Sequence, residues 1–236
     1  MAKRTTSAAK AEPKGTDETG EAPAPESVAQ VKLQRLEMLH FTFHLEGVTP
    51  LIIHQWSEKA KREMMEKGGP AKAKRIKPQR DPDADFNEAR YLLNQPREDA
   101  HTDGIPAVAF KAAIVQAARA FEGVTMTALK QFIYVEGEPP EMLVPIIGKP
   151  QRREDMVRVG KGLNKTADLR WRPEYWPWAV NLVVRWPSAM FEKESILTLL
   201  DAAGQGGVGE WRPTAPQSMT GIFGQFRVVE GELRRQ

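Results

Sequence analysis

The sequence of 236 residues contains no cysteine. This absence excludes a disulfide framework, a cysteine-ligated zinc site and a thiol nucleophile, and it fits a reducing compartment. No apolar run is long enough to cross a bilayer, and the first residues lack the hydrophobic core of a signal peptide. We therefore expect an intracellular, cytoplasmic protein with no membrane partner.

A strong charge imbalance is also missing. The formal net charge is only +3, so the distribution of charge along the chain says more about partners than its sum. Residues 1–33 contain few large apolar residues and cannot offset the entropy cost of ordering. We predict a flexible tail there, either a solvated leader or a partner-binding arm, followed by a single domain over residues 34–236.

Hydrophobic periodicity predicts the main elements of that domain. Apolar residues alternate in "MLHFTFHLEG" (38–47) and "AVNLVVRW" (179–186), which indicates two half-buried strands. The segment 106–121 reads as an amphipathic helix with Pro106 in its first turn. A second helix is expected over about 193–203, with Gly204 as its stop signal.

Weaker patterns complete the sequence of elements. We expect a hairpin of two short strands over 130–136 and 142–148, and a last strand over 223–231. A polar helix is expected over 57–69 and a short helix over 86–93. Two insertions are expected over about 55–103 and 148–177, and the second of them is basic and irregular. Without the insertions the order is β-α-β-β-α-β. This order predicts an α+β fold with a ferredoxin-like (RRM-like) core.

The segment "GQGGVGEWRPTAPQSMTGIFGQF" (204–226) concentrates glycines around a tryptophan and an arginine. Its glycines follow a helix, whereas phosphate-binding glycine loops precede one, so ordinary nucleotide binding is excluded. One interpretation is a helix C-cap with a flexible turn. The other is a backbone at Gly207 and Gly209 that approaches a ligand, with Trp211 to stack and Arg212 to bind phosphate.

Two segments carry cations that could bind nucleic acid. Cations interleaved with aromatic residues suit a single strand of nucleic acid, which needs neutralisation of its backbone and stacking partners for its bases. In the second insertion these residues are Arg152, Arg153, Arg158, Lys161, Lys165, Arg170, Trp171 and Arg172. The first insertion contributes Lys59, Lys61, Arg62, Lys72, Lys74 and Arg75. It is a nucleic-acid-contacting arm, a subunit contact or a mobile surface loop, and the second insertion is either a binding arm or a solvated charged loop.

Catalytic signals are weak. His40 and His44 project from one face of the same predicted strand, so a metal pair or an acid/base couple is conceivable. No cluster of carboxylates with ligand spacing accompanies them, and no nucleophile elbow is present. We expect no cofactor and no metal, and we keep the two histidines as the alternative catalytic residues.

Two stretches resemble the RAMP superfamily, which includes the repeat-RNA-binding proteins of CRISPR systems. The first is "GIPAVAFKAAIVQAARAF", similar to the entry into the first helix of that superfamily, with Lys111 in the motif; the second is the glycine-rich "GGVGEWRP…GIFGQF". The resemblance implies a backbone subunit whose insertions grip a guide RNA and a neighbouring subunit. The chain also resembles phage proteins, which implies the cytoplasm of a host cell.

The leading hypothesis is therefore a non-catalytic protein that binds single-stranded nucleic acid, with RNA favoured over DNA. It would form a homo-oligomer or filament along the strand, with Lys111 and the cations and aromatics named above as contacts. Two alternatives remain open. One is a metal-independent endoribonuclease that uses His40 or His44, and the other is a phage structural or assembly protein that binds only protein.

Overall fold

The computed structural model describes residues 35–56, 65, 80–94, 102–159, 166–216 and 220–229. Contacts between residues divide the chain into two units, Met1–Arg35 and Leu36–Gln236, and the fold described below belongs to the second unit. The predicted tail and nearly all of the predicted helix over 57–69 lie outside the described residues.

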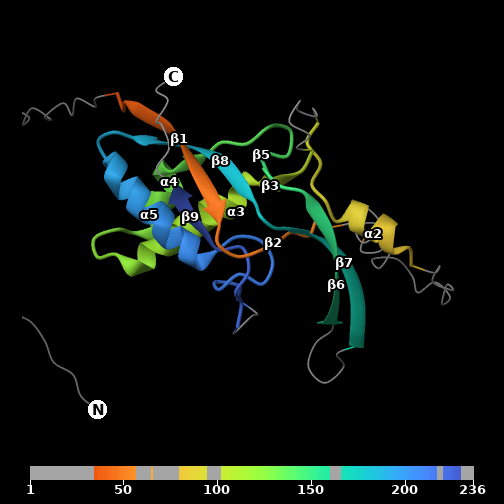
Figure 1. Cartoon of the computed structure of the whole chain (residues 1–236). Helices are drawn as coiled ribbons and strands as arrows, with labels where there is room; N and C mark the ends of the chain where they lie inside the picture. Colours follow the sequence, from red (N-terminus) through yellow and green to blue (C-terminus); the bar gives the residue numbers. More distant parts are fainter. Residues whose placement is uncertain are drawn as a thin grey trace, which may run out of the picture. The chain divides into compact units, whose positions relative to one another are not determined.

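A four-stranded antiparallel sheet forms the centre of the fold (Figure 1). Its strand order is β4-β8-β1-β9, with the strands β4 (Tyr134–Val135), β8 (Ala179–Pro187), β1 (Met38–Gly47) and β9 (Phe226–Val229). The two long central strands pair along their whole length, and Phe43 lies opposite Leu182. The strong strands predicted from alternation are confirmed, because one face of each is buried in the core.

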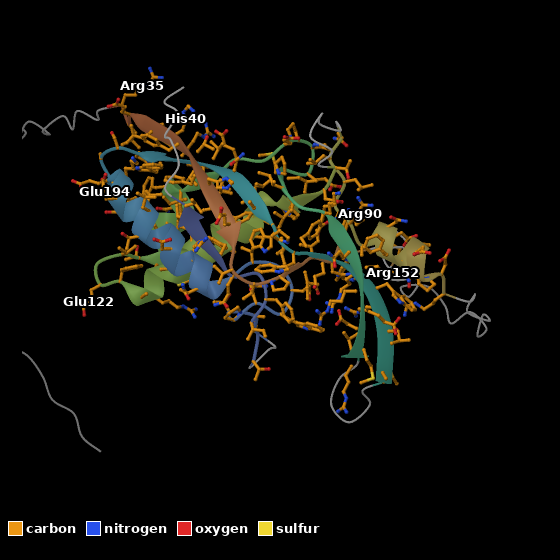
Figure 2. All side chains as sticks on the ribbon, in the orientation of Figure 1. Arg35, His40, Arg90, Glu122, Arg152 and Glu194 are labelled. Carbon is orange, nitrogen blue, oxygen red and sulfur yellow. The ribbon has the colours of Figure 1, made fainter. Side chains whose placement is uncertain are left out.

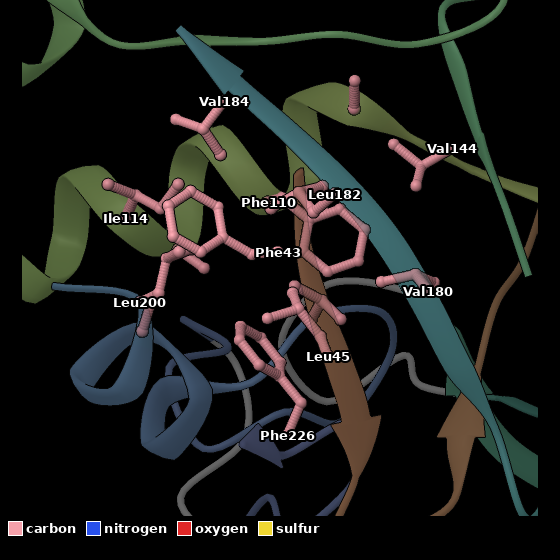
Figure 3. Close-up of a cluster of buried hydrophobic side chains, with 14 of the residues drawn as sticks. Phe43, Leu45, Phe110, Ile114, Val144, Val180, Leu182, Val184, Leu200 and Phe226 are labelled. Atoms are coloured by element: carbon pink, nitrogen blue, oxygen red, sulfur yellow. The ribbon is translucent and has the colours of Figure 1, made fainter. Parts of the chain in front are cut away.

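Two helices cover one face of this sheet. Helix α3 (Ala107–Ala117) continues into a 3-10 turn, η1 (Ala118–Ala120), and packs against helix α5 (Lys193–Gly206). The core between helices and sheet is apolar and includes Phe43, Phe110, Leu182, Leu200 and Phe226 (Figure 3). Both predicted helices are confirmed, since their apolar stripes meet the apolar alternation of the strands.

Helix α5 does not end where Gly204 predicted. It runs three residues beyond the predicted end at 203, to Gly206, and Gly207 forms its cap with a φ of 70°. Gly204 serves packing instead, because a Cβ there would lie 2.0 Å from the carbonyl oxygen of Phe226. The glycine therefore lets the helix approach strand β9 closely.

The second insertion is a regular hairpin, so the prediction of an irregular stretch was wrong. Strands β6 (Pro150–Val159) and β7 (Thr166–Tyr175) are ten residues long and antiparallel, and β2 (Leu51–Ile52) adds a short third strand beside β7. Helix α2 (Pro82–Glu88) packs against β7, close to the predicted helix at 86–93. Charged residues fill the inward positions of the hairpin, which hides its alternation from a hydrophobicity pattern.

The hairpin predicted over 130–136 and 142–148 is also not formed as such. Thr125 caps a helix, α4 (Met126–Phe132), that takes up the first three residues of the segment 130–136. The remaining strand β4 pairs with β8, whereas β5 (Leu143–Pro145) pairs with β3 (Gly104–Pro106) in a separate small sheet. The fold is thus a mixed α+β structure with antiparallel sheets.

The packing of Gly204 against β9 gives a stability prediction. Gly→Ala inside a helix normally stabilises by roughly 0.5–1 kcal/mol. At position 204 we expect the opposite, a loss of about 2 kcal/mol or more in the free energy of unfolding, because the added Cβ meets backbone. Urea unfolding of Gly204→Ala checks this. Gln205→Ala, an exposed change in the same helix, is the control and should stay within about 0.5 kcal/mol; equal stability of both variants would contradict the packing role.

Candidate nucleic-acid interface

The base of the β6–β7 hairpin contains a buried ion pair. The Arg172 side chain is only 1% exposed, and its Nη2 donates to Asp155 Oδ2 at 2.6 Å. Arg153 on the neighbouring strand donates to Asp155 at 2.9 Å and to Glu174 at 2.5 Å. Buried charges require such partners. The two arginines are therefore neutralised within the protein.

The same arginines stack on aromatic side chains of the glycine-rich segment. The Arg172 guanidinium lies 4.4 Å from the centre of the Trp211 ring, and Arg153 lies 4.9 Å from the Phe223 ring. Cation–π contacts of this kind strengthen when water is excluded. They attach the base of the hairpin to the segment that follows α5.

The glycines of that segment approach the protein's own backbone. A Cβ at Gly209 would lie 2.4 Å from the Ile52 carbonyl oxygen, and one at Gly224 would lie 1.8 Å from that of Val208. Val208 donates its N–H to the Gly224 carbonyl at 2.9 Å, and both glycines have positive φ angles. Packing of the chain on itself thus accounts for the need for glycine at these positions.

Trp211 and Arg212 fold back in the same way. Arg212 is half-buried and donates to the Gly209 carbonyl at 2.8 Å, while Trp211 is held by Arg172. Gly207, another predicted contact in this segment, is the buried C-terminal cap of α5. A role of this segment in nucleic-acid binding stays a prediction, and its observed contacts are structural.

Most other predicted contacts on the hairpin also have partners. Arg152 pairs with Asp83, and Arg170 lies 3.6 Å from Asp168. Trp171 donates its Nε1–H to Glu154 at 2.8 Å. Arg158 is exposed on β6. The remaining predicted cations of the two insertions lie outside the described residues: Lys59, Lys61, Arg62, Lys72, Lys74, Arg75, Lys161 and Lys165.

The sheet face away from α3 and α5 carries a different set of polar residues. Tyr134, Arg185 and His40 pair directly across β4, β8 and β1, so they form one row. Tyr134 is 45% exposed, and the Arg185 guanidinium lies 5.9 Å from its ring centre. Figure 2 shows His40 beside β1 on the side away from α5. Neighbouring strands are about 4.8 Å apart, so the row spans about 10 Å.

Lys111 belongs to the same neighbourhood. Its Nζ lies 5.2 Å from the centre of the Tyr134 ring, although Lys111 comes from helix α3. Arg185 also pairs with Glu136 at 2.8 Å, but both side chains are nearly half exposed. Exposed pairs contribute little to stability and exchange readily for other partners.

The two candidate catalytic histidines do not converge. They are four residues apart on one strand, a separation of about 13 Å at 3.3 Å per residue. His44 Nδ1 lies 2.8 Å from Asn181 Oδ1, its cross-strand neighbour. Among the described residues, no group of three or more potential metal ligands is found. The geometry does not bring the pair to one metal ion or one reacting atom.

Sequence reasoning named Lys111 as a nucleic-acid contact and His40 only as an alternative catalytic residue, and it named neither Tyr134 nor Arg185. Each of the missed residues is isolated in the sequence, and only the β4–β8–β1 register brings them together. The alternation of β8 did place Arg185 opposite the apolar face. The strand predicted over 130–136 contains Tyr134, but only the structure shows the register that places it beside Arg185.

No protein-family model matches this sequence, and a search of curated proteins finds no match either. Within the described part of the chain, no helix has the length and apolarity that a membrane span requires.

The buried pair at the hairpin base gives one prediction. Arg172→Met should lower the free energy of unfolding by about 3 kcal/mol, because a buried carboxylate loses its closest partner. The double variant Arg172→Met/Asp155→Leu should recover a large part of this loss. Urea unfolding measures both, with Arg170→Met as the partly exposed control, expected within about 1 kcal/mol. An equal loss for Arg172→Met and Arg170→Met would contradict the role of Arg172 as the buried partner of Asp155.

His54 gives a second, pH-dependent prediction. Burial, aided by the charges of Arg170 and Arg172, lowers the pKa of His54 from 6.5 to about 4, and its Nδ1 has no hydrogen-bond partner among the described residues. The unfolded chain therefore binds more protons between these values, so stability falls as the pH drops from about 6.5 to about 4.

His54→Gln cannot take up that proton. Its free energy of unfolding should fall less steeply over this range than that of the unaltered protein, by at most about 1.4 kcal/mol per pH unit. Chemical unfolding at several pH values compares the two proteins. Parallel curves would show that His54 does not resist protonation in the folded state.

Proposed function

We propose that this protein binds single-stranded nucleic acid without cleaving it, and that the strand lies across the face that carries Tyr134, Arg185 and His40. The observation that supports this most is the row itself: an aromatic ring, a guanidinium and an imidazole in register on three adjacent strands. Each of these groups is planar and can stack on a base.

Charge at the row fits a phosphate backbone. Arg185 and Lys111 flank Tyr134, and the exposed Arg227 of β9 lies further across the sheet. The carboxylates that pair with Arg185 and Arg227 are themselves partly exposed, so phosphate oxygens can replace them at low cost. The hairpin-base arginines differ, because Arg172 is buried with its partner. The proposed contacts are therefore the residues at the row and Arg227, and the hairpin-base arginines Arg153 and Arg172 are left out.

Strand order adds a second line of support. The elements follow the order β1-α3-β4-β8-α5-β9, and the sheet reads β9-β1-β8-β4 with all neighbours antiparallel. We infer a ferredoxin-like core from this order, elaborated by insertions after β2 and at the β6–β7 hairpin. In RRM modules of this topology, aromatic residues on the sheet stack two or three bases. The RAMP resemblance and assembly along the strand are parts of the same proposal.

RNA is the preferred ligand of the proposal. His44 and Asn181 form a polar pair on the same sheet face, four residues along β1 from His40, and such groups can bind a 2′-hydroxyl, which acts as donor and acceptor. Competition between RNA and DNA oligonucleotides of the same sequence tests this part separately.

Fluorescence anisotropy with labelled single strands tests the proposed face. Tyr134→Ala should weaken binding about five- to hundredfold, because base–aromatic stacking is worth about 1–3 kcal/mol per base. Arg185→Ala should reduce the slope of log K against log salt by about 0.7, one phosphate contact on a single strand. Arg119→Ala removes an exposed cation from η1, on the helical side, and should change neither quantity.

Three results would contradict the proposal. They are the absence of binding, binding that does not weaken with salt, and equal effects of Arg185→Ala and Arg119→Ala. Cleavage of the labelled RNA that disappears in His40→Ala would instead favour the endoribonuclease.

A further inference from the structure

Among the described residues, no strand pairs with the outer edge of β6 in the β6–β7 hairpin. Strand β6 is the terminal strand of its sheet, whose order is β2-β7-β6, and the hairpin extends away from the four-stranded sheet (Figure 1). Met156 and Leu169 face each other across the two strands and are 65% and 43% exposed. A two-stranded ribbon with an open edge and exposed apolar residues has marginal stability by itself and invites pairing with a further strand.

The charges of β6 are arranged symmetrically about Met156. Glu154 precedes it by two residues and Arg158 follows it by two, so all three side chains lie on the same face of the strand. Both charged residues are exposed. Antiparallel pairing with a second β6, with Met156 opposite Met156 of the partner subunit, places Glu154 opposite Arg158 of the partner subunit, and the two-fold axis repeats this contact.

Other registers are worse. Along β6, every second residue directs its N–H and C=O to the free edge. In an antiparallel pair of two β6 strands such residues must face each other, so two paired residues are both even-numbered or both odd-numbered. Centring the pair on Asp155 or on Glu154 puts two identical carboxylates opposite each other, which is destabilising. Centring it on Val157 leaves Glu154 without an opposite charge within β6. Of the four centres, Glu154, Asp155, Met156 and Val157, only Met156 places Glu154 and Arg158 opposite each other.

We propose that β6 is a dimerisation edge, through which two copies of this chain join their hairpins into one antiparallel sheet. The order of that sheet is β2-β7-β6-β6-β7-β2. Met156 and Leu169 from both copies form an apolar cluster on one face, flanked by two contacts between Glu154 and Arg158. Trp171 holds one carboxylate oxygen of Glu154, Oε2, at 2.8 Å, which orients the group. The occupant is a second copy because the charge pattern complements itself about a two-fold axis.

The dimer does not depend on nucleic acid. A short β-ladder covers less surface than the roughly 800 Å² per partner of a standard interface, so we expect micromolar association. Sedimentation velocity of the full chain, freed of nucleic acid and measured from about 1 to about 300 μM, should show a monomer–dimer equilibrium. The result is therefore separate from the outcome of the strand-binding experiment.

Charge exchange tests the register. Glu154→Arg places arginine opposite Arg158 twice, and Arg158→Glu places two glutamates opposite each other twice. Each single variant should dimerise about tenfold more weakly or worse. The double variant Glu154→Arg/Arg158→Glu should dimerise like the unaltered protein. A mixture of the two single variants should form a heterodimer, since each then meets its opposite charge.

The controls separate folding from association. Circular dichroism and unfolding curves should be the same for all three variants, because both positions are exposed. A protein that stays monomeric over the whole range overturns the proposal. So does a dimer that neither single variant weakens, or one that neither the double variant nor the mixture restores; these results would point to a different surface or to a different protein as the occupant of β6.

Discussion

The buried guanidinium of Arg172 determines how the outer parts of this fold are arranged. It lies against Asp155 of the paired strand, Trp211 of the glycine-rich segment and, at 3.6 Å, Glu210. Removing a charge from water is costly, and only well-placed partners offset the cost. The contacts therefore join the β6–β7 hairpin to the chain after α5, which is distant from it in the sequence. Because of them, the hairpin has a fixed base next to the four-stranded sheet.

The same constraint explains why the base of the basic β6–β7 hairpin is not the best candidate for binding. Arg153 and Arg172 are engaged by carboxylates and aromatic rings. Ion pairs between strands can replace apolar pairs as the inward contacts of a ribbon, provided that every charge has a partner. Arg185 and Arg227, whose ion pairs are partly exposed, lie instead on the open sheet face. The outer hairpin, beyond this network, retains an exposed strand edge.

The sequence allowed the core to be predicted and hid the arrangement of its surroundings. Strands β1 and β8 and helices α3 and α5 follow hydrophobic periodicity, because each buries one apolar side. The hairpin was missed for the opposite reason, since its buried positions include Asp155 and Arg172. Glycine content indicated close backbone contact after α5, and that contact exists, but with Ile52 and Val208 of the same chain. Composition shows that a backbone must approach something; only the fold shows what it approaches.

The candidate binding face depends on register, which no local pattern reveals. Tyr134 belongs to a predicted strand over 130–136 of which only Tyr134–Val135 forms a strand, and Arg185 is one charged residue in an apolar strand. Their pairing with each other and with His40 creates the row. Photocrosslinking of a thiouridine-containing single strand, followed by mass spectrometry of the crosslinked peptides, locates the bound bases directly. We predict crosslinks in 38–47, 134–136 and 179–187. Crosslinks confined to 204–224 or to the helical side would contradict binding on the open face of the sheet.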